Sequence, residues 1–197
     1  MKMKTILIIL GALGLIFVIV QVIYYYKIQS NIETYPYEVV KDYDTFEIRN
    51  YEASLFTSVK LNEGNYKETS SKGFSVLAGY IFGDNKKNEK IAMTSPVAMT
   101  IEDNSTMMFM VPGKFNKEDL PEPTNNAITF KEMPAKKVAA ITFGGWANDE
   151  KINEYKEKLV AALKASNIKH TNNFYFFGYN APFEIIKRKN EVIVELE

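Results

Sequence analysis

The chain opens with one long apolar run. Ile6–Tyr26 comprises 21 residues without a charged side chain, and about 20 such residues are enough to cross the hydrocarbon core of a bilayer as a helix. Lys2 and Lys4 precede the run, and Tyr24–Tyr26 stands at its far edge as an interfacial aromatic belt does. The pattern predicts an N-terminal transmembrane helix within a membrane anchor of residues 1–28.

A cleaved signal peptide is the alternative interpretation of this run. Its apolar region would be shorter, about 7–15 residues, and would end in a small-x-small cleavage motif, which Val22–Lys27 does not offer. An uncleaved anchor therefore agrees better with the sequence. The lysines before the run favour a cytoplasmic N-terminus, which predicts a single-pass membrane protein whose soluble domain lies on the extracytoplasmic side.

The rest of the chain repeats one order of elements. Tyr37–Val59 alternates as extended chain, with a break near Tyr43-Asp44, and Tyr66–Phe82 carries apolar residues at helical spacing. Ala127–Phe143 is again extended, and Gly144-Gly145 with Asn148 prepares a second helix. The apolar stripe of this helix consists of Ile152, Tyr155, Leu159 and Ala162 or Leu163.

A methionine-rich hairpin follows the first predicted helix. Ile91–Met99 is an apolar run interrupted by Thr94-Ser95-Pro96, and a proline there favours two extended pieces that meet at a bend. Val97–Glu102 and Met107–Val111 are the expected strands, joined by a turn at Asp103–Ser105. Methionine adapts to irregular apolar partners, which suits a flat ligand and equally suits an ordinary core.

In the second half, Phe174–Pro182 takes the place of the run before the first hairpin. Phe183–Lys187 and Val192–Leu196 are then expected to pair around Arg188–Asn190. The doubled order strand, helix, strand, strand predicts an α+β domain in which antiparallel strands curl into one sheet or barrel and both helices lie outside it. The halves cover about residues 37–111 and 127–197 of a domain spanning 29–197, and Pro112–Asn126 links them.

Composition removes several classes of function. Lys plus Arg equals Asp plus Glu at 24 each, so there is no basic field that would attract nucleic acid. The absence of cysteine excludes disulfides, thiolate metal sites and cysteine nucleophiles. His170 is the only histidine, which excludes a serine triad and multi-histidine metal sites. We assign no catalytic residue, and any metal ligand is unknown.

The remaining candidate for a functional site is a concentration of apolar and aromatic residues near the two bends. Pockets lined by such side chains with a few polar groups are the usual form of a small-ligand site, although core packing would explain the same residues. The residues concerned are Met93, Met99, Met107, Met108, Met110, Phe174–Phe177, Tyr179 and Phe183.

Short motifs in a fixed order connect the domain to a known family. They are Tyr37–Val40 followed by Phe46–Tyr51, then Ile91–Val97, Tyr179–Pro182 and Arg188–Val192. In these motifs and in their order, the chain resembles the SOUL haem-binding family over nearly all of residues 37–197. The N-terminal apolar run lies outside this resemblance.

The resemblance implies a distorted antiparallel β-barrel of two β-α-β-β repeats, and binding of haem or another tetrapyrrole without obligatory catalysis. It places the porphyrin in an apolar groove beside the first helix and the nearby strand loops. The residues it implies as cofactor-binding are Phe74, Leu77, Ala78, Ile81, Met93, Tyr175, Phe177 and Tyr179.

The mode of binding follows from what the first half lacks. No histidine stands there, so the expected mode is apolar contact, with a lysine or arginine near the haem propionates. Two alternatives stay open. One is an effector-binding module for another flat apolar molecule, and the other is an enzyme that releases iron from a tetrapyrrole.

Overall fold

The structure is a computed structural model that describes residues 9–17, 19–20, 32–61, 66–101, 105–181, 184 and 188–197. It divides into two compact units, Met1–Ile32 and Glu33–Glu197. In the first unit, residues 9–17, 19 and 20 are helical, and the rest of the predicted Ile6–Tyr26 span lies outside the described residues. Within the described ranges, no helix has the length and apolar character needed to cross a membrane. The anchor therefore stays a prediction.

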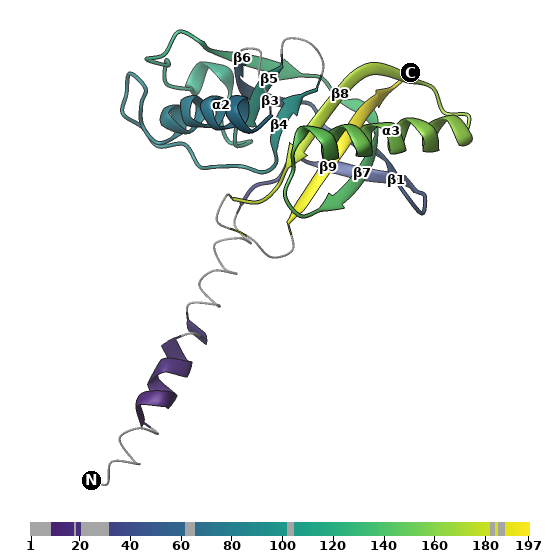
Figure 1. The fold of residues 1–197 in the computed structure, drawn as a ribbon. Coiled ribbons are helices and arrows are strands. Elements are labelled where there is room, and N and C mark those ends of the chain that lie inside the picture. The colour runs from purple at the N-terminus through teal and green to yellow at the C-terminus, as the bar shows by residue number, and fades with distance from the viewer. Residues whose placement is uncertain are drawn as a thin grey trace. The chain divides into compact units, whose positions relative to one another are not determined.

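The described part of the second unit contains a nine-stranded sheet, two α-helices and one 3-10 turn (Figure 1). In chain order the elements are β1 (Tyr37–Asp42), β2 (Glu47–Tyr51), β3 (Ser54–Lys60), α2 (Tyr66–Ile81), β4 (Val97–Thr100), β5 (Thr106–Met110), η1 (Lys117–Asp119), β6 (Ile128–Met133), β7 (Lys136–Gly144), α3 (Asp149–Ala165), β8 (His170–Gly178) and β9 (Lys189–Leu196).

The strand order explains how two similar halves make one sheet. The order is β1-β2-β7-β9-β8-β4-β5-β3-β6, and every neighbouring pair is antiparallel. From the central β8–β4 pair, one side runs β9-β7-β2 and the other runs β5-β3-β6. Thus β2 from the first half pairs with β7 from the second, and β6 from the second half pairs with β3 from the first. Each half completes the sheet of the other.

The sheet is more open than predicted. The strands curl into a half-barrel, with β1 and β6 as its two end strands. A closed barrel would need these two strands to pair, and the strand order of the described residues contains no such pair. The α+β class and the antiparallel pairing are confirmed, and the barrel is corrected to a half-barrel.

Most predicted elements are present, with two corrections. The predicted break at Tyr43-Asp44 separates β1 from β2, but a second break at Glu52-Ala53 divides the rest of Tyr37–Val59 into β2 and β3. The second hairpin joins β8 to β9, so Phe174–Phe177 is a hairpin strand and not the equivalent of the run before β4. Within Phe183–Lys187, which was expected to be that strand, only Glu184 is described.

Both helices cover the same face of the sheet. In Figure 1, α2 lies over β3 and β5, and α3 lies over β7, β8 and β9. A methyl group at Gly73 of α2 would overlap Leu61 and lie 3.3 Å from the Met107 sulfur, so glycine lets α2 approach β5 closely. The N-termini of the two helices meet, because the Asp149 carboxylate at the start of α3 accepts hydrogen bonds at 3.0 and 3.1 Å from the Tyr66 backbone N–H at the start of α2.

Alternation along the strands sorts the core into three clusters. The α2 cluster consists of Val59, Leu77, Ala78, Tyr80, Ile81, Ile91, Met99, Met107, Phe109, Val111, Leu120 and Ile128. The α3 cluster consists of Phe46, Ile48, Ala139, Ile141, Phe143, Ile152, Leu159, Leu163, Phe174, Phe176, Val192 and Val194. The helix-free cluster, on the opposite face, consists of Tyr35, Tyr51, Phe56, Ala98, Met108, Met110, Met133, Val138, Ala140, Tyr175, Phe177 and Ile193.

Candidate functional site

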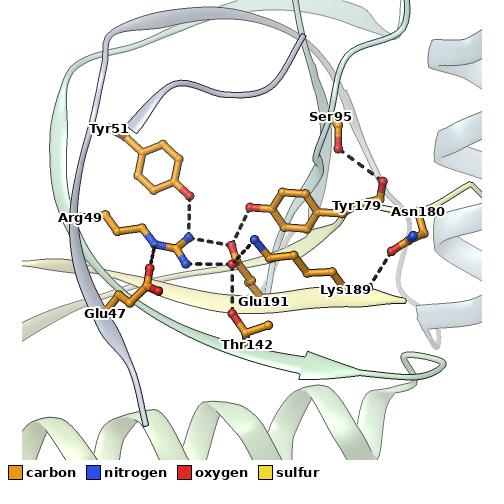
Figure 2. Close-up of polar contacts among 9 residues, drawn as sticks. All are labelled: Glu47, Arg49, Tyr51, Ser95, Thr142, Tyr179, Asn180, Lys189 and Glu191. Atoms are coloured by element: carbon orange, nitrogen blue, oxygen red, sulfur yellow. Dashed lines mark hydrogen bonds and ion pairs between the residues drawn. The ribbon is translucent and has the colours of Figure 1, made fainter. Parts of the chain in front are cut away.

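The structure divides the eight residues implied as cofactor-binding between two faces of the sheet. Five of them belong to the α2 side, where three are buried in the α2 cluster and two are partly buried against it. Those five are Phe74, Leu77, Ala78, Ile81 and Met93. The other three belong to the helix-free side, and they are Tyr175, Phe177 and Tyr179. The sheet lies between the α2-side residues and the side chains of Tyr175 and Phe177. Tyr179 follows β8, and its carbonyl accepts a hydrogen bond at 3.4 Å from the hydroxyl of Ser95, which stands two residues after Met93 in the chain (Figure 2).

On the α2 side, the buried members are not surface groups. Leu77, Ala78 and Ile81 pack between α2 and the sheet. Phe74 is partly buried and its ring centroid lies 5.3 Å from that of Phe109. Among the apolar side chains that reach the surface here are Phe74, Met93, Val97 and Phe115, which are partly buried, and Phe82, which is 61% exposed.

The segment that carries Met93 is fixed at both ends. The Ile91 N–H donates to the Ile81 carbonyl at 2.8 Å, which joins the segment to the end of α2. The Thr94 hydroxyl donates to the Met110 carbonyl at 2.7 Å. Lys90 and Lys114 precede Ile91 and Phe115 in the chain, and the Lys114 ammonium lies 4.9 Å from the Phe115 ring centroid. This surface therefore combines part-exposed apolar groups with ammonium groups.

The helix-free side holds a buried ion pair that the sequence analysis did not identify. The Arg49 side chain is 2% exposed and that of Glu191 is 0% exposed. Two guanidinium nitrogens, Nη1 and Nη2, donate to the two Glu191 carboxylate oxygens at 2.9 Å each, and Nε donates to Glu47 at 2.7 Å (Figure 2). The pair joins β2 to β9 across β7, so it links strands that are not neighbours.

Further polar groups converge on the same carboxylate (Figure 2). The Tyr179 hydroxyl donates to Glu191 at 2.6 Å, and the Thr142 hydroxyl donates at 3.1 Å. The Lys189 ammonium lies 3.0 Å from it. The Tyr51 hydroxyl accepts a hydrogen bond from Arg49 at 3.3 Å. A buried charge is tolerated only when it is paired and hydrogen-bonded, and Glu191 meets both conditions.

These contacts determine the protonation states of Glu191, Arg49 and Tyr179. Burial alone would raise the pKa of Glu191, but the hydrogen bonds and charge of Arg49 hold that pKa below its usual range. Burial would likewise lower the pKa of Arg49, and the Glu191 partner raises it instead. Burial and the neighbouring Glu191 charge raise the pKa of Tyr179. At neutral pH the group is therefore an ionised pair beside a neutral phenol.

A second polar group occupies the same face. The Glu195 carboxylate accepts hydrogen bonds from Lys136 at 2.9 Å, from the Tyr175 hydroxyl at 2.7 Å and from Asn173 at 2.8 Å. The Lys136 ammonium also lies 4.0 Å from the Tyr175 ring centroid. Tyr175 and Tyr179 therefore use their hydroxyls to hold carboxylates of β9, which is a role that the sequence analysis did not anticipate.

A cavity of about 590 Å³ lies beside the helix-free cluster. Its volume falls within the range of about 300–1,000 Å³ that is usual for small-molecule sites. Three tyrosines contribute to its wall, and no lysine, arginine or histidine does. The lining residues are Thr34, Tyr35, Pro36, Tyr37, Glu38, Asn50, Tyr51, Glu52 and Ala135.

His170 lies far from the α2 surface. It begins β8, whereas Gly178 ends it and pairs with Val97. At about 3.3 Å per residue the two ends of β8 are about 26 Å apart. The His170 imidazole Nδ1 lies 2.6 Å from the Thr171 carbonyl, and the ring packs against Phe174. Across the described ranges, no group of three His, Cys, Asp or Glu side chains could hold a metal ion.

Comparisons with known proteins point in one direction. The family model described as SOUL heme-binding protein matches residues 32–195. Heme-binding protein 1 of Xenopus laevis is 29% identical over 160 residues, which cover 77% of this chain and 84% of that protein. Heme-binding protein 2 of Homo sapiens is 27% identical over 157 residues, which cover 75% of this chain and 76% of that protein.

Solved structures share the fold at low identity. The C-terminal domain of EcmrR has a TM-score of 0.60 at 11% identity, over 82% of this chain and 98% of that one. A hydrolase from Listeria innocua has a TM-score of 0.54 at 8% identity, over 80% of this chain and 94% of that one. At these identities the likeness concerns the fold alone.

The first prediction concerns the buried pair. Glu191→Gln keeps the shape of the side chain but leaves the Arg49 guanidinium buried without its main counter-charge. We expect the free energy of unfolding to fall by about 3–5 kcal/mol, measured by urea denaturation of the full chain in nonionic detergent. Glu47→Gln removes a partly exposed partner and should cost about 1 kcal/mol or less. A Glu191→Gln cost no larger than that of Glu47→Gln would contradict the assigned role.

The second prediction concerns pH. Because the folded-state pKa of Glu191 is lowered, its contribution is complete above the unfolded-state value of about 4.3 and is lost as pH falls through the folded-state pKa. The stability difference between the wild type and Glu191→Gln should therefore be constant from neutral pH to about pH 5 and shrink below about pH 4. The same denaturation series at stepped pH measures it. A difference that grows on acidification would show that Glu191 is not held ionised.

Proposed function

The chain belongs to the SOUL heme-binding protein family, and on that premise we propose that it binds haem or a related tetrapyrrole. The observation that carries the proposal is the family match over residues 32–195. Relatives named as heme-binding proteins match over most of their own length, which supports it. The proposed role is binding without obligatory turnover.

We place the tetrapyrrole on the α2 side of the sheet. Phe74, Met93 and Phe82 offer part-exposed apolar surface there, and such surface is what a flat apolar ligand covers. Lys114 stands next to Phe115 of this surface in the chain, and Lys90 stands three residues before Met93. Their ammonium groups can pair with the carboxylates of haem. The cavity on the other face has Glu38 and Glu52 in its wall and no cationic side chain, so it suits an anionic ligand less.

The same residues indicate how the tetrapyrrole would be bound. Bound haem would supply its own iron chemistry, and the chain contributes apolar contact and charge pairing. His170 is about 26 Å along β8 from the strand end that pairs with Val97, so it does not reach the proposed surface. Tyr175 and Phe177 lie on the opposite face and are not part of this surface.

We further propose that residues 1–28 hold the protein at a membrane, with the domain on the extracytoplasmic side. The support is the uncharged 21-residue run Ile6–Tyr26 preceded by Lys2 and Lys4. An uncleaved anchor would tether the domain to a bilayer. This proposal is independent of the ligand, and its failure would leave haem binding unaffected.

Haem binding is tested by titrating the full chain in nonionic detergent with hemin. We expect a Soret shift with micromolar affinity. Met93→Glu places a negative charge on the proposed surface and should weaken affinity about tenfold or more, a cost of about 1.4 kcal/mol. Val40→Glu is the matched control, because Val40 is a half-exposed apolar residue on β1 at the end of the sheet. His170→Ala should leave the affinity unchanged.

Four results would separate the alternatives. No spectral change with hemin would overturn haem binding. An equal loss of hemin affinity in Met93→Glu and Val40→Glu would overturn the placement on the α2 side. Loss of the Soret shift in His170→Ala would show that the histidine ligates iron. Release of iron from bound hemin under reducing conditions, at a rate above that of free hemin, would favour an enzyme over a binding protein.

The anchor is tested by extraction of membranes with alkaline carbonate. We expect the full chain to stay with the membrane fraction, because a spanning helix is not released by high pH. Leu13→Lys with Ile16→Lys places two charges in the middle of the run and should release the protein. Protease added to the outside of intact cells, after removal of any cell wall or outer membrane, should digest the domain. Wild-type protein in the carbonate supernatant would overturn the anchor, and a protected domain would overturn its orientation.

A further inference from the structure

The cavity on the helix-free side is not used by the proposed haem site. We propose that it is a second ligand site, which takes a small organic cation such as a quaternary ammonium or a protonated amine. This site lies on the opposite face of the sheet from the proposed tetrapyrrole surface. Its lining residues differ, and so does the charge of its ligand. Three observations carry it.

The first observation is an aromatic wall. Tyr37 and Tyr51 lie with ring centroids 5.0 Å apart, and Tyr35 and Tyr51 lie 4.4 Å apart. All three residues line the cavity, and Tyr37 is 37% exposed. The faces of aromatic rings attract cations, and several rings around one space are the form in which quaternary ammonium groups are recognised.

This wall already holds one cation. The Arg49 guanidinium carbon lies 4.3 Å from the Tyr37 ring centroid. The charge of Arg49 is matched by Glu191 and Glu47, both of which accept hydrogen bonds from it. Arg49 therefore does not make the cavity basic, and it fixes the Tyr37 ring that the cavity presents.

The second observation is the sign of the charge. Glu38 and Glu52 line the cavity, and none of its lining residues carries a positive charge. Two acidic residues in the lining, with no basic residue, favour a cation and disfavour a carboxylate-bearing ligand such as haem. The charge of the wall therefore distinguishes this cavity from the α2 surface.

The third observation is an unpaired polar atom. Within the described ranges, the Tyr35 hydroxyl is buried and has no hydrogen-bond partner, and Tyr35 lines the cavity. Leaving such a group unpaired in an interior is costly, so a residue of this kind marks a place where a polar partner is missing. Burial raises the pKa of Tyr35 to about 12, so the hydroxyl is neutral at neutral pH and its oxygen can accept a hydrogen bond from a protonated amine.

The test compares three water-soluble aromatic probes that differ in charge. Benzyltrimethylammonium, benzyl alcohol and benzoate are titrated by calorimetry into the full chain in nonionic detergent. We expect the cation to bind about tenfold or more tightly than benzyl alcohol, and benzoate to bind more weakly still. Cation affinity equal to that of benzyl alcohol would overturn the proposal.

Variants then locate the binding. Glu38→Gln with Glu52→Gln should weaken benzyltrimethylammonium about fivefold or more, and Tyr37→Leu should weaken it through loss of the ring. The matched control is Glu89→Gln with Glu157→Gln, which neutralises two exposed carboxylates outside the cavity wall. Equal losses in the two double variants would show that only net charge matters and would overturn the site.

A hemin titration of the same samples separates this proposal from the proposed function. Glu38→Gln with Glu52→Gln should bind hemin as the wild type does, and saturating benzyltrimethylammonium should leave the hemin affinity unchanged. One-for-one competition between hemin and the cation would overturn a separate site. Failure of hemin to bind would leave the cation result standing.

Discussion

The ion pair between Arg49 and Glu191 is the constraint on which the helix-free face depends. Two desolvated charges from β2 and β9 are tolerated because they are in bidentate contact, and this contact links two strands that are not neighbours in the sheet. Thr142 on the intervening β7 and Tyr179 after β8 also donate to Glu191. One carboxylate thus ties together strands from both halves of the chain, and the exchange of β2 and β6 between halves makes the two halves one folding unit.

The sheet separates two surfaces that differ in composition. The α2 side presents apolar groups with lysines nearby in the chain. On the helix-free side, Arg49 and Lys136 pair with carboxylates of β9, and Glu38 and Glu52 line the cavity. Curved antiparallel sheets with helices on one face leave the other face available for ligands. In the two proposals, charge distinguishes the ligands: lysines stand near the α2 surface in the chain, whereas the cavity lining has two acidic residues and no basic one. The shared fold with EcmrR and a Listeria hydrolase says nothing about ligand on either face.

The sequence predicted elements and alternation well, because these depend on local spacing. Val138 and Ala140 face the helix-free cluster while Ala139, Ile141 and Phe143 face α3, as their alternation indicates. It could not predict the set of residues that meet at a site. Arg49 and Glu191 are 142 residues apart. Each has an asparagine on one side and a single apolar neighbour on the other, Ile48 or Val192, so no local pattern marks either residue as buried. Tyr175 and Phe74 were grouped by resemblance, but the β4–β8 register places them on opposite faces, and that register is set by long-range pairing.

The central claim is that the two faces of the sheet are separate surfaces and that the tetrapyrrole covers the α2 side. Methionines report on both faces: Met93 is partly buried on the α2 side, and Met108, Met110 and Met133 lie in the helix-free cluster. Methyl NMR of the full chain, labelled with carbon-13 at the methionine methyl groups, measures the paramagnetic broadening caused by ferric haem. The account predicts strong broadening of the Met93 methyl signal and little change in the signals of Met108, Met110 and Met133. Broadening of the Met108, Met110 and Met133 signals, with Met93 unaffected, would contradict it.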